Sequence, residues 1–174
     1  MIDNQGRIQV YTGNGKGKTT AALGLVMRAV GAGKKVFFAQ FVKKGDFSEI
    51  KILKKRFPEV VVYQFGHEGF IFDTPSEEDI CDAVKGLETV SKIIADGDFD
   101  MVVLDEINIA LYYKLISVES VVEMLKAKDP SVEIIMTGRY FPPELTDLAD
   151  LVTDMQNVKH FFDNGVGARK GIEY

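Results

Sequence analysis

A stretch rich in glycine and lysine near the start of the chain has the residue types and spacing of a phosphate-binding loop. It reads Thr-Gly-Asn-Gly-Lys-Gly-Lys-Thr-Thr over residues 12–20, after a strand-like run at 7–11 and before a helix-like run at 21–30. Glycines let a polyphosphate approach the main chain, whose N–H groups donate to it, and the start of a helix adds partial positive charge. The order of strand, loop and helix therefore favours a nucleoside triphosphate site over a plain glycine-rich hairpin.

The residues of this loop have separate expected roles. In the pattern G-x-x-x-x-G-K-[ST], Lys18 brings a point charge to the phosphates and the Thr19 hydroxyl binds Mg²⁺. Lys16 is an additional lysine and a second expected phosphate contact. The first glycine of the pattern would fall on Thr12, and Gly13 comes one position late, so the nucleotide need not lie as it does in a common NTPase. The ATP-binding residues expected in the loop are Gly13, Asn14, Gly15, Lys16, Gly17, Lys18, Thr19 and Thr20.

Two acidic residues, Asp105 and Glu106, follow the hydrophobic run at 101–104, which is the Walker B pattern. We expect one carboxylate to reach Mg²⁺, directly or through water, and the other to orient a reactant or complete the metal shell. Because Mg²⁺ keeps several waters, Thr19 and one acid suffice beside phosphate oxygens. A strand that ends by chance in surface acids is the alternative, and the loop upstream favours the metal site.

Further candidates are two arginines and two phenylalanines. Arg139 offers a fork of donors that suits phosphate oxygens, with a plain surface arginine as the alternative. Arg28 is also an ATP-binding candidate, although its place along the first helix favours a structural ion pair. Phe70 and Phe72 lie in a glycine- and aromatic-rich segment, and either anchor that loop or form an apolar wall for a flat ligand.

The elements that must position these residues alternate between strands and helices. This alternation predicts an α/β fold of the P-loop, RecA-like type, with a doubly wound, mostly parallel sheet of about six strands, helices on both faces and a single domain over 1–174. The expected strands are 7–11, 35–42, 60–65, 101–106, 132–137 and 151–155. Because ligands bind beyond the carboxyl ends of such strands, the candidates should meet at one edge of the sheet.

Composition narrows the class of protein. The 174 residues carry a net charge of −5, which argues against a nucleic-acid binder. Cys81 is the only cysteine, so disulfides within the chain and cysteine-cluster metal sites are excluded, and its helical pattern predicts a buried thiol. No apolar run is long enough to span a bilayer, and the first residues lack a signal-peptide pattern. We therefore expect a cytoplasmic protein without a membrane partner.

Seven segments, taken in order, resemble the P-loop-type cob(I)alamin adenosyltransferases. The likeness covers nearly the whole chain, and the short Gly-Asn-Gly-Lys-Gly-Lys-Thr loop is a specific mark of that family, which also accounts for the displaced first glycine. The segments are 13–22, 69–74, 103–108, 137–139, 149–155, 158–160 and 171–174.

The resemblance implies a transferase. In that family the reduced cobalt of a corrinoid attacks the 5′-carbon of ATP, adenosylcobalamin forms and triphosphate leaves, with ATP held in the reverse sense from ordinary P-loop enzymes. Attack at carbon needs no general base, so Lys16, Lys18 and Thr19 are the catalytic candidates, which act with Mg²⁺ by positioning and by stabilising the leaving triphosphate. The implied partners are an electron-donating reductase and a second copy of the chain in a homodimer.

The resemblance also implies the corrinoid contacts, which are Phe70, Phe72 and Asn108. Phe70 matches a family phenylalanine that covers the lower face of the corrin, whereas Phe72 stands where the family has tryptophan. Arg169 stands where glutamine is usual. Many relatives carry an N-terminal extension that folds over this site, so here we expect a more open site or one covered by a partner chain.

Two other functions remain as alternatives. One is a P-loop ATPase or small-molecule kinase that releases ADP, against which the lack of an obvious water-activating residue counts. The other is a non-catalytic ATP-binding module that delivers a corrinoid.

Overall fold

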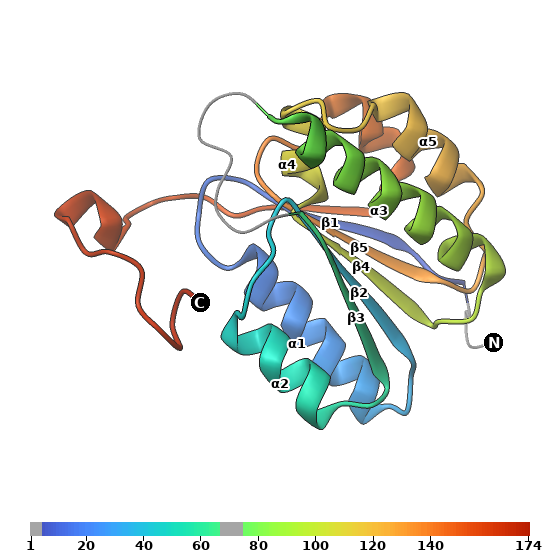
Figure 1. Cartoon of the computed structure of the whole chain (residues 1–174), viewed down its shortest axis with the longest axis horizontal. Helices are drawn as coiled ribbons and strands as arrows, with labels where there is room; N and C mark the ends of the chain where they lie inside the picture. The colour runs from blue at the N-terminus through green and yellow to red at the C-terminus, as the bar shows by residue number, and fades with distance from the viewer. Residues whose placement is uncertain (1–4, 67–74) are drawn as a thin grey trace.

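Six parallel strands form one sheet in the computed structural model, which describes residues 5–66 and 75–174 (Figure 1). Their order across the sheet is β3-β2-β4-β5-β1-β6, and every pairing is parallel. The strands are β1 (Ile8–Thr12), β2 (Val36–Phe41), β3 (Val60–Phe65), β4 (Met101–Asp105), β5 (Glu133–Thr137) and β6 (Leu151–Asp154). This confirms the predicted doubly wound α/β fold.

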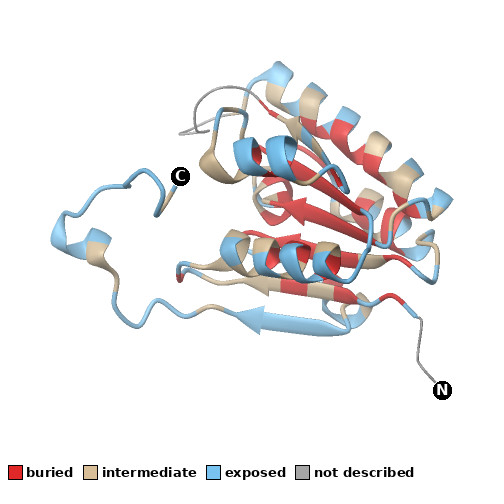
Figure 2. Ribbon diagram, turned by 90° about the horizontal axis from the view of Figure 1, so that it is seen from below, coloured by how far each residue is buried: buried red, intermediate tan, exposed pale blue. Residues whose placement is uncertain are grey.

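Helices cover both faces of this sheet (Figures 1 and 2). One face carries α1 (Lys18–Gly31) and α2 (Ser48–Arg56), and the other carries α3 (Glu77–Asp96), α4 (Ile107–Tyr112) and α5 (Val118–Lys126). Two 3₁₀ helices, η1 (Pro143–Leu148) and η2 (Phe161–Asn164), follow. Within the described residues no helix combines the length and the apolar character needed to cross a bilayer.

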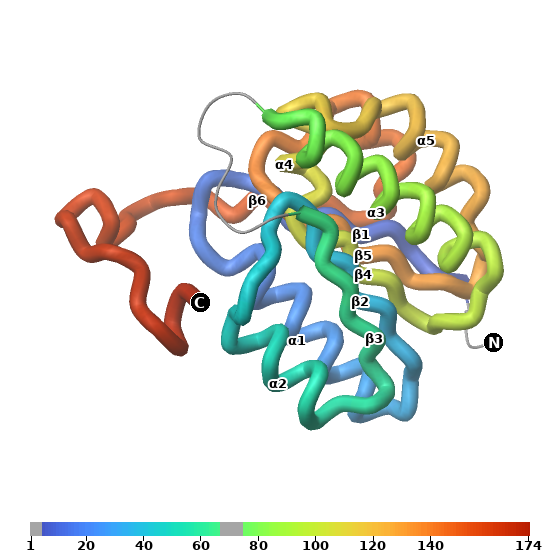
Figure 3. The backbone as a smooth tube through the Cα atoms, in the orientation of Figure 1, coloured from blue at the N-terminus to red at the C-terminus, as the bar shows by residue number. Residues whose placement is uncertain are grey.

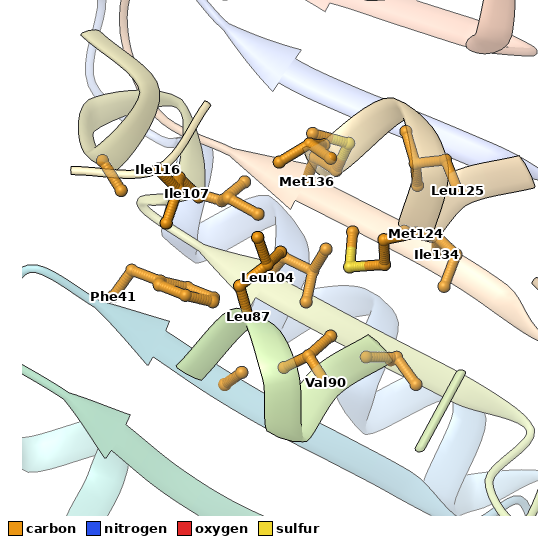
Figure 4. Packing of buried hydrophobic residues seen from close by; sticks show 14 of the residues in the cluster. Phe41, Leu87, Val90, Leu104, Ile107, Ile116, Met124, Leu125, Ile134 and Met136 are labelled. Carbon is orange, nitrogen blue, oxygen red and sulfur yellow. The ribbon is translucent and has the colours of Figure 1, made fainter. Parts of the chain in front are cut away.

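Alternation along β2 shows why the sheet is buried on both sides. Phe37 and Phe41 belong to the core under α3, α4 and α5, whereas Val36 and Phe38 belong to the core under α1 and α2. Successive side chains of a strand point to opposite faces, so an unbroken apolar run fills both cores. Figure 4 shows the larger core, where Leu104 of β4 lies among residues from the helices above it.

The strand order places the predicted site residues at one edge of the sheet. β1, which leads into the phosphate loop, lies between β5 and β6, and β4, which ends in the acids, lies on the far side of β5. Since all strands run the same way, their carboxyl ends meet at one edge, and Thr137 at the end of β5 lies between the loop and the acids. Beyond β6 the last twenty residues extend past this edge and return toward α1 and α2 (Figure 3).

One expectation about the core was wrong. Cys81 is exposed on α3, not buried. The buried stripe of that helix consists of Ala83, Gly86, Leu87, Val90 and Ile94. Cys81 lies next to that stripe in sequence but on another side of the helix.

Candidate active site

The phosphate loop is packed against the end of β6. Gly13 and Gly17 have φ angles of 95° and 120°, which favour glycine. A Cβ atom on Gly13 would lie 2.1 Å from Asp154 Oδ1, and one on Gly15 would lie 2.6 Å from the Met155 carbonyl oxygen. The Gly15 N–H also donates to that carbonyl at 2.6 Å. The loop therefore needs glycine both for its backbone shape and for its close contact with the chain after β6.

Lys18 begins α1 and turns back over the loop. Its Nζ atom donates to the carbonyl oxygens of Gly13 at 2.8 Å and Gly15 at 2.7 Å. Partial burial and the nearby charge of Arg139 lower the pKa of Lys18. The ammonium group is thus held in a partly buried, electropositive position, where an anionic ligand would favour its charged form.

Asp105 is fully buried and fully hydrogen-bonded. Its Oδ1 accepts from the hydroxyls of Thr19 at 2.8 Å and Thr137 at 2.7 Å, and its Oδ2 accepts from Gln40 Nε2 at 3.0 Å. Gln64 Nε2 donates to Gln40 Oε1 at 2.9 Å, so the network continues from β4 through β2 to β3. The sequence analysis missed Gln40, although its polar side chain in a run of buried apolar residues was a signal.

Glu106 faces a different partner from its neighbour. It adopts a left-handed conformation with φ 60°, and its N–H donates to Thr137 Oγ1 at 3.0 Å. Its side chain forms an ion pair with Lys43, whose Nζ lies 2.5 Å from Glu106 Oε1. Burial alone would lower the pKa of Lys43, but the carboxylates of Glu106 and Asp105 raise it. The sequence placed residues 41–43 at this edge, because they end a predicted strand, but it gave Lys43 no role in the site.

Two cavities open at this edge of the sheet, and Lys43 lines both. The first has a volume of about 340 Å³ and lies between Thr19, Thr20 and the end of the chain at 171–174. The second, of about 400 Å³, is lined by the side chains of Lys18, Val42, Lys43, Glu106, Ile109, Tyr113, Arg139 and Tyr140. A larger cavity of about 920 Å³ between α3 and α5 is lined by none of the predicted site residues.

The end of the chain holds the extra lysine of the loop. Lys16 Nζ donates to Glu173 Oε1 at 2.6 Å and to the Ile172 carbonyl at 3.0 Å. Arg169 also pairs with Glu173, with 3.1 Å between Nη2 and Oε1. Hydrogen bonds from Arg169 and Lys16 lower the pKa of Glu173 to about 2. Arg169, whose type departs from the family pattern, thus has a partner within the tail.

The structure brings most predicted site residues together, but not all of them. Arg28 is exposed and lies about 15 Å along α1 from Lys18, at 1.5 Å per residue. Asn108 is fully buried, and its Nδ2 donates to the Gly138 carbonyl at 2.9 Å, so its corrinoid contact stays a prediction. Phe70 and Phe72 lie outside the described residues.

Known proteins match the chain along its whole length. The family described as ATP:corrinoid adenosyltransferase BtuR/CobO/CobP matches residues 4–174. A corrinoid adenosyltransferase of Escherichia coli K12 is 41% identical over 99% of this chain and 87% of its own length. One from Pseudomonas aeruginosa is 38% identical, over 99% of this chain and 85% of its own.

The chain belongs to the ATP:corrinoid adenosyltransferase family. This confirms the resemblance found in the sequence and the transferase class that it implied. A further family member, the corrinoid adenosyltransferase CobA of Salmonella typhimurium, is 40% identical over 99% of this chain and 87% of its own. For an adenosyltransferase of this family, the substrates are ATP and a corrinoid, and the edge described above has loop, hydroxyl and carboxylate groups suited to the nucleotide.

Proposed function

We propose that this adenosyltransferase binds the triphosphate of ATP in the loop at 13–20 and transfers the 5′-deoxyadenosyl group to the reduced cobalt of cob(I)alamin or a related corrinoid. The observation that supports the proposal most directly is the environment of the Lys18 ammonium group. Within residues 5–66 and 75–174 this ammonium group has only loop carbonyls as hydrogen-bond acceptors, and burial and Arg139 lower its pKa. A triphosphate would give it an anionic partner in the same place.

The residues present fit a Mg²⁺ ion that enters with ATP. The hard oxygen donors of Thr19 and Asp105 lie in contact, Glu106 follows Asp105 directly as a further candidate ligand, and phosphate oxygens would complete the shell. No group of three or more His, Cys, Asp or Glu side chains suited to a metal ion occurs among the residues that the structure describes. Mg²⁺, when bound, neutralises charge on the leaving triphosphate.

The chain's own groups supply positioning and charge. The cobalt nucleophile forms a bond to the 5′-carbon, the bond from that carbon to the phosphate oxygen breaks, and the electron pair leaves with the triphosphate. Lys16, Lys18 and the loop N–H groups stabilise this leaving group, and Arg139 adds a cation beside Lys18. No proton has to be removed from the nucleophile, so the site needs no general base.

The assay is incubation with ATP, Mg²⁺ and chemically reduced cobalamin, followed by the corrinoid absorbance change and by phosphate analysis. The proposal requires adenosylcobalamin and triphosphate in equal amounts. Release of ADP would instead identify an ATPase or kinase. Binding of ATP and cobalamin without any product would identify a delivery module.

Partners and location complete the proposal. We propose a homodimer that works with an electron-donating reductase in the cytoplasm, without nucleic acid or membrane partners. The cytoplasm supplies ATP. It also keeps thiols reduced, which suits a chain whose one cysteine, Cys81, has no disulfide partner within the chain. Phe70, Phe72 and Asn108 remain the proposed corrinoid contacts.

A further inference from the structure

Tyr140 combines a strained backbone with an exposed ring. It follows Arg139 directly and has a φ of 61°, a left-handed conformation that bulky side chains rarely adopt. The residue is 50% exposed, so burial of the ring does not offset this strain. Non-glycine residues held in such conformations cluster at ligand-binding sites, where the constraint fixes a side chain for its function.

The ring of Tyr140 stacks on that of Tyr112 in α4. The ring centroids lie 4.1 Å apart with an angle of 25° between the planes, and Tyr112 is itself 53% exposed. Tyr113 packs edge-on against Tyr112 at 5.4 Å. Because α4 follows the acids of β4 and Tyr140 follows Arg139 after β5, this aromatic group is attached to the same two chain segments that carry the predicted site.

Two of these three tyrosines line the second cavity of the site, and Tyr112 packs behind them. Tyr140 and Tyr113 line it together with Lys18 and Glu106. Val42, on the same cavity, lies against Gly66, where a Cβ would be 2.8 Å from the Val42 carbonyl carbon. Gly66 is the last described residue before the segment that contains the predicted corrinoid contacts. The cavity, about 400 Å³, accepts only part of a corrinoid, so the rest of the macrocycle would cover its rim.

We propose that Tyr140, supported by the stacked ring of Tyr112, forms an aromatic wall that binds the corrinoid macrocycle, without a part in ATP binding. This inference rests on the proposed function, and it adds that the corrinoid approaches the nucleotide through this cavity. Tyr140, which lines the cavity and is half exposed, offers apolar contact to the broad macrocycle, and its hydroxyl can pair with amide groups on the rim of that macrocycle. Stacking on Tyr112 holds the Tyr140 ring in position despite its strained backbone.

The test compares Tyr140→Gly, Tyr140→Ala and Tyr140→Phe in the full chain, with chemically reduced cobalamin and ATP as the varied substrates. We expect Tyr140→Gly and Tyr140→Ala to raise KM for cobalamin roughly tenfold and to leave KM for ATP unchanged, because one stacked aromatic contact is lost. Tyr140→Phe keeps the ring and should keep KM. Tyr140→Gly should also raise the melting temperature above that of Tyr140→Ala, since glycine alone relieves the strained φ.

The matched control is Tyr63→Ala. Tyr63 is 51% exposed and stacks on Phe37 at 5.5 Å, yet it lines neither cavity of the site. An unchanged KM for cobalamin in Tyr140→Gly, or a raised KM for ATP, would contradict the proposed corrinoid contact. Lys18→Ala, assayed alongside, tests the phosphate loop separately: full activity in that variant would overturn the proposed function, whatever Tyr140 does.

Discussion

The Thr19 hydroxyl donates a hydrogen bond to Asp105 Oδ1 at 2.8 Å, and this contact joins the phosphate loop to the strand that carries the acids. β1 and β4 are not neighbours in the sheet, because β5 lies between them. Thr137, at the end of β5, donates to the same oxygen at 2.7 Å and so completes a link across three strands. These two hydrogen bonds therefore fix the relative position of the loop and Asp105.

Removal of the Thr19 hydroxyl should lower Mg²⁺-dependent activity strongly and the stability of the fold only slightly. We expect Thr19→Ala to lower kcat/KM on the order of 10²-fold, the effect typical of losing one group that stabilises the transition state. Thr19→Ser keeps the hydroxyl and should restore most activity. The measurement is the rate as a function of Mg²⁺ concentration. If Thr19→Ala needs no more Mg²⁺ than the unchanged protein, Thr19 is not a metal ligand.

Lys18 has a natural control in Lys128. Both ammonium groups donate to backbone carbonyls, and burial lowers the pKa of each, but Lys128 bonds Gly6 and Val132 at the opposite end of the sheet. Lys18→Ala should abolish adenosyl transfer with little change in melting temperature. Lys128→Ala should lower the melting temperature and leave transfer intact. The measurements are the transfer rate and the melting temperature of both variants. Loss of activity in both variants would show that the effect of Lys18→Ala is structural.

Glu173 should titrate far below an ordinary glutamate. Its pKa is about 2 in the folded chain against an ordinary value of 4.5, because Arg169 and Lys16 donate to the carboxylate. A depressed pKa means that the tail contact is fully present above pH 4.5 and is lost as the pH falls through 2. NMR titration of the Glu173 carboxyl carbon measures this. Arg169→Gln should raise the pKa towards 4.5, and a value that stays near 2 would assign the shift to another group.

ATP binding should change the same signal. A triphosphate in the loop competes with Glu173 for the Lys16 ammonium group, which now lies 2.6 Å from Glu173 Oε1. We therefore expect the pKa of Glu173 to rise when Mg–ATP is added. The titration is repeated with saturating nucleotide, and Lys16→Ala provides the control. In that variant the pKa of Glu173 should already be raised and should not change when nucleotide is added. An unchanged value in the original chain would mean that Lys16 stays on the tail and does not contact the phosphates.

Gln40 should stabilise the buried carboxylate. Gln40→Leu leaves Asp105 Oδ2 without its partner and removes one of the two acceptors of the Gln64 amide, and an unsatisfied buried polar group costs about 1–3 kcal/mol. Denaturant unfolding should show this loss. The matched variant is Gln9→Leu, because Gln9 also donates to a carboxylate, that of Glu133, but in a half-buried position. Its cost should be below that of Gln40→Leu, and the reverse order would contradict the importance of the buried network.

Sequence reasoning found the parts of the site that depend on local order. Strand, loop and helix around residues 13–20 follow from glycine, lysine and apolar periodicity, and the acids of β4 follow from a hydrophobic run that ends in charge. Both patterns are contained in single short segments. For the same reason the parallel sheet was predicted correctly, since alternating strands and helices permit few other arrangements.

Contacts between distant segments were not accessible in this way. The Lys43–Glu106 ion pair and the Gln40–Asp105 hydrogen bond depend on which strands are neighbours and on their register, where Gln40 lies opposite Asp105. The backbone of Tyr140 could not be predicted, because nothing in its residue type favours a left-handed conformation. Cys81 was misplaced because several faces of α3 carry apolar residues, and periodicity alone did not decide which face is buried.

The loop glycines that touch the segment after β6 have a consequence for how the protein can vary. Neither Gly13 nor Gly15 has room for one more carbon atom, because Asp154 and Met155 fill the space. The phosphate loop and the segment after β6 therefore have complementary shapes. Over evolutionary time a substitution in either segment would be tolerated only with a compensating change in the other, so these distant segments should co-vary among relatives.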